Sequence, residues 1–144
     1  MMPTAFAQIV SAIIDALKAA PAVCPLIDRA RSTQIPEQAD KAVSVQWDSA
    51  QPEAGTISGA PMDWQTRITV EVFASSVKES GDLVVDPLLS AVAQRLGQNT
   101  TLDGLVADLR IAGLEAENDS KGKKTGWVRL TYIADHRTSN GILN

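Results

Sequence analysis

The sequence predicts an α+β fold: a single mixed or antiparallel sheet of about four to five strands, with two main helices packed on one face. Two stretches place apolar residues at helical spacing, and three stretches alternate apolar and polar residues as half-buried strands do. Helices and strands come in runs, not in strict β-α-β alternation, which favours α+β over a doubly wound parallel sheet. A chain of 144 residues has room for one domain, which we expect to span residues 1–144.

The composition is that of an ordinary globular protein, and it argues against several classes of function. The 17 acidic residues outnumber the 13 basic ones, so the net charge is −4 and the pI is about 4.9. General DNA- or RNA-binding modules normally carry a basic stripe, which this balance does not suggest. The single cysteine, Cys24, can form no disulfide within the chain. Together with the single histidine, His136, it cannot complete a Cys/His zinc site.

The N-terminal segment carries no sign of secretion or membrane insertion. The apolar stretch before Asp15, the first charged residue, is too short to span a bilayer and lacks the basic start of a signal peptide. We therefore expect a protein made in a cytoplasm, with no membrane partner.

The first predicted element is an amphipathic helix over residues 5–20. Thr4 is a suitable N-cap, and Pro21 ends the helix. Apolar side chains recur along one side of it, namely Phe6, Ile9, Val10, Ile13 and Leu17. Such a stripe is expected to cover one face of a sheet.

Three strands are predicted before the second helix. Residues 26–31 indicate a short edge strand, because prolines interrupt the surrounding segment. Residues 42–47 and 64–74 alternate apolar and polar side chains, so each stretch predicts a half-buried strand. The sixteen residues 48–63 between them exceed an ordinary hairpin turn. We expect a long loop there, disordered in the isolated chain or ordered by contact in an assembly.

The second helix is predicted to begin at Asp86, because an aspartate followed by Pro87 is a strong start signal. Gly97 is expected to end this helix in the left-handed conformation. The remaining segments predict a strand from 109 to about 117, a polar loop over 118–126, an alternating strand over 127–137 and a flexible tail over 138–144.

The residues provide little evidence for catalysis. Asp135, His136 and Ser139 include the residue types of a nucleophilic triad, but no nucleophile elbow surrounds them. The first two are neighbours on a strand, so their side chains point to opposite faces. His136 is therefore expected to be structural or solvated, and Cys24 to be an apolar filler. We expect no enzyme activity, no cofactor and no metal site, although an oxygen-only Mg²⁺ site at Asp82 and Asp86 stays open.

The second face of the predicted sheet is mixed, which suits either solvent or another subunit. Phe73, Trp127 and Ile133 fall among its polar residues. The only basic cluster consists of Lys121, Lys123 and Lys124. These lysines keep a hairpin tip soluble, or they contact an acidic partner surface or DNA passing nearby.

Two stretches resemble the tail terminator proteins of long-tailed bacteriophages, the group typified by the lambda minor tail protein U. In the first stretch, residues 42–45 lead through a long loop to Asp63-Trp64-Gln65 and then to residues 68–73, which end in Glu-Val-Phe. The second stretch contains Asp86-Pro87-Leu88-Leu89, Arg95-Leu96, Leu102-Asp103-Gly104-Leu105, Trp127-Val128-Arg129-Leu130-Thr131-Tyr132 and Arg137-Thr138. Together they cover about residues 42–138, and the amphipathic first helix is also in its expected place.

The resemblance implies a structural virion protein that is assembled in the cytoplasm of the bacterial host. Such a protein forms a homo-hexameric ring on the tail tube protein, stops tube polymerisation and presents a surface to the head-tail connector. Genomic DNA passes through the lumen of the ring without specific binding. The acidic net charge agrees with passage without binding, because repulsion between the protein and the DNA phosphates lets the DNA slide through.

Under this interpretation the interfaces are expected in the long loop, in the Lys-rich loop and on the mixed face. The residues expected there are Asp48, Glu53, Asp63, Phe73, Lys121, Lys123, Lys124 and Trp127. Two alternatives remain. One is another small neck, head-completion or tail-tube protein. The other is a small ligand-binding α+β domain, which predicts a deep apolar pocket.

Overall fold

Five strands and two helices make up the described part of the chain in the computed structural model, which covers residues 3–29, 40–53, 60–119, 124–139 and 141–144. In chain order the elements are α1 (Ala5–Lys18), β1 (Ile27–Arg29), β2 (Lys41–Pro52), β3 (Met62–Ser76), α2 (Gly81–Gly97), β4 (Asp108–Asp119) and β5 (Lys124–Thr138). The strands form one sheet in the order β1-β2-β3-β5-β4.

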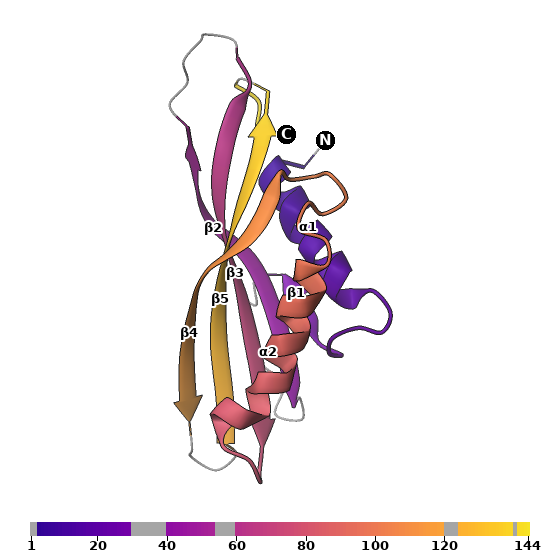
Figure 1. Cartoon of the computed structure of the whole chain (residues 1–144), viewed down its shortest axis with the longest axis vertical. Helices are drawn as coiled ribbons and strands as arrows, with labels where there is room; N and C mark the ends of the chain where they lie inside the picture. Colours follow the sequence, from indigo (N-terminus) through magenta and orange to yellow (C-terminus); the bar gives the residue numbers. More distant parts are fainter. Residues whose placement is uncertain (1–2, 30–39, 54–59, 120–123, 140) are drawn as a thin grey trace.

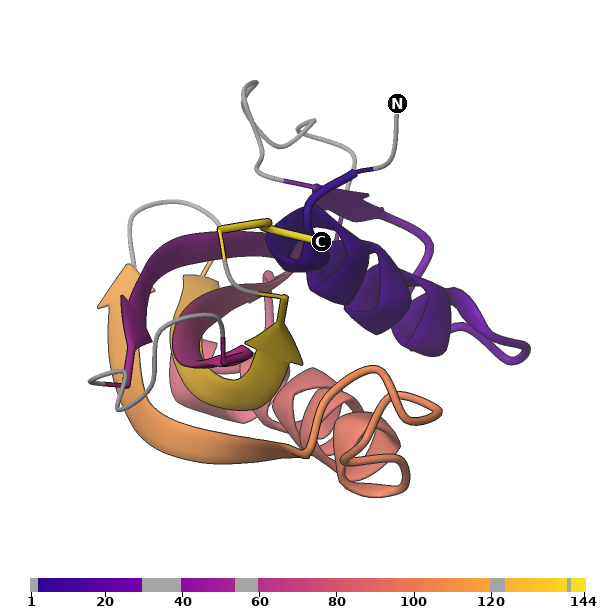
Figure 2. The ribbon, with the colours of Figure 1, turned by 90° about the horizontal axis from the view of Figure 1, so that it is seen from above.

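The sheet is mixed and strongly twisted, and both helices lie on the same side of it (Figure 1). β1 runs parallel to β2 at one edge, and the other neighbouring strands are antiparallel. The view from above shows both helices beside the sheet and leaves its other face uncovered (Figure 2). The predicted α+β class, the number of strands and the short edge strand are confirmed.

The core lies between the helices and one face of the sheet. On the helix side of β3 the buried residues are those predicted from the alternation: Thr66, Ile68, Val70, Val72 and Ala74. On β5 they are Val128, Leu130, Tyr132 and Ala134, and on α1 they include Phe6, Ile9, Val10, Ile13 and Leu17. Thr4 caps α1 as predicted, since its hydroxyl oxygen accepts a hydrogen bond from the Ala7 N–H at 3.3 Å.

The predicted loop over residues 48–63 is wrong at both ends. β2 continues to Pro52, β3 begins at Met62, and the Glu53 N–H donates to the Asp63 carbonyl oxygen at 2.8 Å. A β-bulge between Trp47 and Ser49 breaks the two-residue period, which hides the rest of the strand. This end of the hairpin extends beyond the helices, so it needs no apolar face (Figure 1). Residues 54–59 lie outside the described residues.

The predicted start of the second helix is also wrong. α2 begins at Gly81, after Ser80, so Pro87 is the seventh helical residue. Proline removes the N–H that would bond to the carbonyl oxygen of Leu83. Leu83 and Pro87 are both exposed, so water can satisfy that oxygen.

The end of α2 differs from its prediction too. Gly97 remains helical, and Gln98 caps the helix in the right-handed conformation. Positive φ values occur later instead, at Leu102, Asp103 and Gly104. The left-handed turn therefore lies between α2 and β4, not at the helix end.

β4 and β5 are both longer than predicted, so the polar loop between them is shorter. β4 extends to Asp119, and β5 begins at Lys124. Lys121 and Lys123 lie outside the described residues, as does the side chain of Lys124. The C-terminal segment lies against the start of α1, where the Ala5 N–H donates to the Leu143 carbonyl oxygen at 2.6 Å.

One arginine connects the two helices. The Arg95 guanidinium of α2 donates to the carbonyl oxygens of Ala16 and Ala19 at 2.8 and 2.9 Å, and to that of Pro21 at 2.6 Å. Carbonyl groups at the end of a helix lack intrahelical partners, and a cation is favoured there. Arg95 therefore holds the end of α1 beside α2.

Candidate functional site

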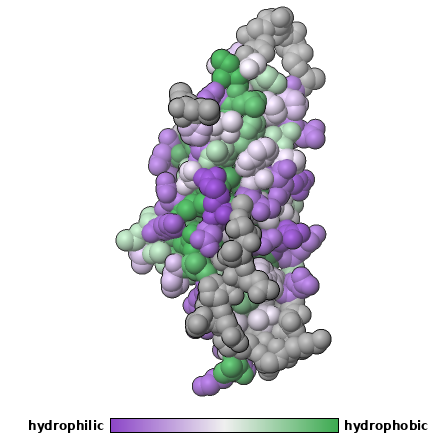
Figure 3. All heavy atoms as spheres, turned by 180° about the vertical axis from the view of Figure 1, so that it is seen from behind, coloured by the Kyte–Doolittle hydropathy of each residue, from purple (hydrophilic) through white to green (hydrophobic). Residues whose placement is uncertain are grey.

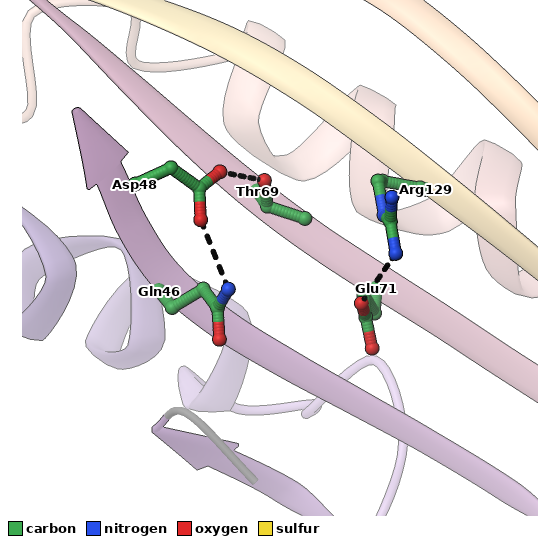
Figure 4. Close-up of polar contacts among 5 residues, drawn as sticks. All are labelled: Gln46, Asp48, Thr69, Glu71 and Arg129. Carbon is green, nitrogen blue, oxygen red and sulfur yellow. Dashed lines mark hydrogen bonds and ion pairs between the residues drawn. The ribbon is translucent and has the colours of Figure 1, made fainter.

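Polar side chains connect three strands on the uncovered face of the sheet (Figure 4). The Asp48 carboxylate accepts hydrogen bonds from the Gln46 amide at 2.9 Å and from the Thr69 hydroxyl, joining β2 to β3. Arg129 of β5 pairs with Glu71 of β3, with 3.4 Å between Nη2 and Oε1. These contacts fill the polar positions of the alternation, so this face is built for an aqueous or polar contact.

A shallow groove runs along this face beside the Glu71–Arg129 pair. Its volume is about 460 Å³, and its lining includes Glu71, Glu115, Glu117, Trp127 and Arg129. A neighbouring hollow of about 360 Å³ shares Glu71, Glu115 and Arg129 with it. Three carboxylates against one guanidinium make the groove acidic, and it is open to solvent, unlike the deep apolar pocket of a small-molecule site.

Phe73 and Trp127, both predicted at an interface, face each other across β3 and β5. They are partners in the register, and their ring centroids lie 4.9 Å apart. Phe73 is buried and Trp127 is half-buried, so the indole is the part of this pair that a partner can reach. The sequence predicted both residues, but not that one covers the other.

The predicted acidic residues Glu53 and Asp63 lie at the opposite end of the sheet. Asp63 pairs with Arg137, with 2.7 Å between Nε and Oδ1, and this arginine lowers the pKa of the Asp63 carboxyl. Asp63 and Phe73 lie ten positions apart on β3, which is about 33 Å along the strand. The expected interface residues that the structure describes therefore form two clusters at the two ends of the sheet, with Asp48 between them.

His136 is buried on the helix side of the sheet. Its Nε2 lies 2.6 Å from the Thr66 hydroxyl oxygen, and its ring packs edge-on against Phe6 with centroids 5.4 Å apart. No described residue provides a hydrogen-bond partner for its Nδ1. Burial lowers the pKa of His136, and the Asp135 carboxylate partly opposes that change. The neutral ring is therefore the form that the fold accommodates.

The residues considered for a nucleophilic triad are not assembled. Asp135 pairs with Arg110 on the uncovered face, whereas His136 points into the core, as their adjacent strand positions predicted. Cys24 is buried, and its thiol donates to the Leu26 carbonyl oxygen at 3.3 Å. Within the described ranges, no three His, Cys, Asp or Glu side chains are grouped as metal ligands. No helix in that part of the chain is long and apolar enough to cross a membrane.

The Glu71–Arg129 pair was not predicted from the sequence. Both residues are visible as polar positions in alternating strands, but their pairing depends on the register between β3 and β5. That register joins residues 58 positions apart along the chain. Opposite charges on the polar faces of two strands are the only local signal, and they do not identify the partner.

No protein-family model matches this sequence. No curated protein matches it either.

Proposed function

We propose that this chain is a structural virion protein of a long-tailed bacteriophage. Six copies form a ring that caps the tail tube, ends tube polymerisation and forms the joint to the head connector. The main support is where the family-like segments lie in the fold. Residues 42–45, 63–73 and 127–132, distant in sequence, fall on the neighbouring strands β2, β3 and β5. They form the centre of one sheet, which is where we expect the segments that a family of the same fold has in common.

The two ends of the sheet suit the two contacts that such a ring requires. One end carries the β2–β3 hairpin with Glu53 and Asp63, and the other carries the half-buried Trp127. A terminator ring meets two different partners, the tube below it and the connector above it. Two chemically distinct surfaces at opposite ends of the sheet, with Asp63 and Phe73 about 33 Å apart along β3, would let a single subunit contact both.

The charge balance supports a lumen through which DNA moves. With a net charge of −4 per copy, the ring as a whole repels phosphate groups. Duplex DNA would then pass without being held. This role needs no catalytic residue and no cofactor, and the buried His136 would serve packing.

Electron microscopy of the purified chain tests the proposal. We expect closed six-fold rings with an axial channel wide enough for duplex DNA, because a heterologous contact closes when its rotation fits. Long tubes would indicate a tube subunit instead. A monomer whose melting temperature rises with a small molecule would indicate the ligand-binding alternative.

A further inference from the structure

Among the described residues, two strands have free edges, at opposite sides of the sheet. β4 is the last strand on one side. On the other side β1 pairs only with residues 43–45 of β2, so among the described residues no strand lies beside residues 46–52 on that edge. A free edge exposes unpaired N–H and C=O groups, which are ready to pair with another strand.

The same two strands carry exposed apolar side chains. Trp47 of β2 is 43% exposed, and Ile111 and Leu114 of β4 are 48% and 54% exposed. These are the only large exposed hydrophobic residues within described strands, since β3 and β5 contain none. From behind, hydrophobic side chains reach the surface in patches between hydrophilic ones (Figure 3). The indole of Trp47 stacks on Phe6 of α1, with ring centroids 5.0 Å apart, and the rest of it is exposed. Unpaired edges and partly exposed apolar side chains therefore occur together in the described strands.

All three side chains lie on the helix side of the sheet. In the register Trp47 is opposite Ile68, Ile111 is opposite Tyr132, and Leu114 is opposite Leu130. The three partners are buried in the core on that side. Directly opposed residues share a face, so the exposed residues share it as well.

The strand directions make the two free edges complementary. β2, β3, β5 and β4 are neighbours in that order, and each pair is antiparallel, so β4 runs opposite to β2. A second copy placed beside the first, with its helices on the same side, would bring its β2 antiparallel to the first copy's β4. Trp47 of one copy would then lie near Ile111 and Leu114 of the other.

We propose that β4 of one copy pairs, antiparallel, with residues 46–52 of β2 of the next copy, so that one sheet continues from subunit to subunit. This inference rests on the proposed ring and specifies its subunit contact. The contact is heterologous, as a ring requires. Both edge strands contain a bulge, at Trp47/Ser49 and at Ile111/Gly113, and bulges increase local twist. The added twist would rotate each copy relative to its neighbour. It therefore disfavours a flat sheet that continues without closing.

Hydrogen exchange on the unmodified chain tests the pairing directly. Dilute and concentrated samples are compared by mass spectrometry. We expect exchange in residues 46–52 and 108–119 to slow at least tenfold on assembly, because free-edge amides gain partners. The central residues of β3 and β5 are already paired on both sides and should not change. Assembly without slower exchange in the two edge segments would overturn the pairing but leave the ring intact.

Lysine substitutions provide a second test. The double variant Ile111→Lys/Leu114→Lys should keep the circular dichroism spectrum of the monomer. The protein concentration at which it assembles should rise at least 100-fold. Leu83→Lys is the matched control, because Leu83 is 61% exposed but lies on α2. Normal assembly of the double variant would overturn the pairing alone. A wild-type chain that remains monomeric at every concentration would overturn both the pairing and the ring.

Discussion

Gly126 of β5 lies directly against the carbonyl group of Gly81, the first residue of α2. A Cβ atom on Gly126 would overlap the Gly81 carbonyl oxygen and would lie 2.8 Å from its carbonyl carbon. Cβ of Val85, one turn further along α2, would be 3.0 Å away. The start of α2 can therefore approach the sheet only because residue 126 has no side chain.

Substituting Gly126→Ala should destabilise the fold by about 3 kcal/mol or more, because the neighbouring backbone must move. Gly97→Ala is the control: apart from its chain neighbours and the backbone of its own helix, no atom lies within 4 Å of the added Cβ, and alanine favours helix. We expect that variant to be neutral or slightly more stable. Urea denaturation measures both changes, and equal midpoints for the two variants would contradict the close approach.

Arg95→Met should weaken the attachment of α1 to α2. Three carbonyl oxygens would lose a charged donor, at a cost of about 2 kcal/mol in the free energy of unfolding. Arg95→Lys should recover only part of this, because an ammonium cannot reproduce the forked geometry. Arg137→Met removes an exposed ion pair and should leave the melting temperature almost unchanged. Equal losses of stability in the Arg95→Met and Arg137→Met variants would argue against a role of Arg95 in holding α1 beside α2.

His136 should make the folded state less stable in mild acid. The unfolded chain binds a proton on this ring near pH 6.5, whereas burial lowers the pKa in the folded state. Between these two pKa values the unfolded state binds more protons, so the free energy of unfolding increases with pH until about 6.5. His136→Gln should remove this increase, even though it lowers stability throughout. Identical pH profiles from pH 5 to 7 would contradict a buried neutral histidine.

The sequence was most informative where one face of a strand is fully buried. The alternation from Thr66 to Ala74 predicted the core side of β3, because a strand buried on one face has to repeat every two residues. The alternation did not predict the part of β2 beyond Trp47, where a bulge changes the two-residue repeat. It also failed at the start of α2, because Asp86-Pro87 is locally a better start signal than Ser80-Gly81. The packing of Gly81 on Gly126 joins residues 45 positions apart, which no local signal reveals.

The candidate site could be predicted only in part. Phe73 and Trp127 stood out as apolar residues on a polar face, and the structure places them in contact. Their mutual burial, and the Glu71–Arg129 pair, depend on the register between β3 and β5. The free edges follow from the strand order, which pairs segments far apart along the chain. No local pattern contains that information.

Replacing residues 54–60 with Asn-Gly should spare the fold but prevent head-to-tail joining. The shortened connection leaves the Glu53–Asp63 backbone pair and a four-residue hairpin turn, which is an ordinary length. Complementation of a phage that lacks its own copy measures the effect, with joined particles counted by electron microscopy. Gly97→Ala serves as the control with an intact hairpin. Normal numbers of joined particles from the shortened variant would remove this segment from the proposed contacts.

The most direct test of the proposed ring is its mass in solution, measured by light scattering over a wide range of protein concentration. Six copies of 15.3 kDa give about 92 kDa, and a closed ring should reach that mass and grow no further. A plateau at that value is the result we predict. Continued growth with concentration, or a monomer throughout, would contradict a hexameric ring.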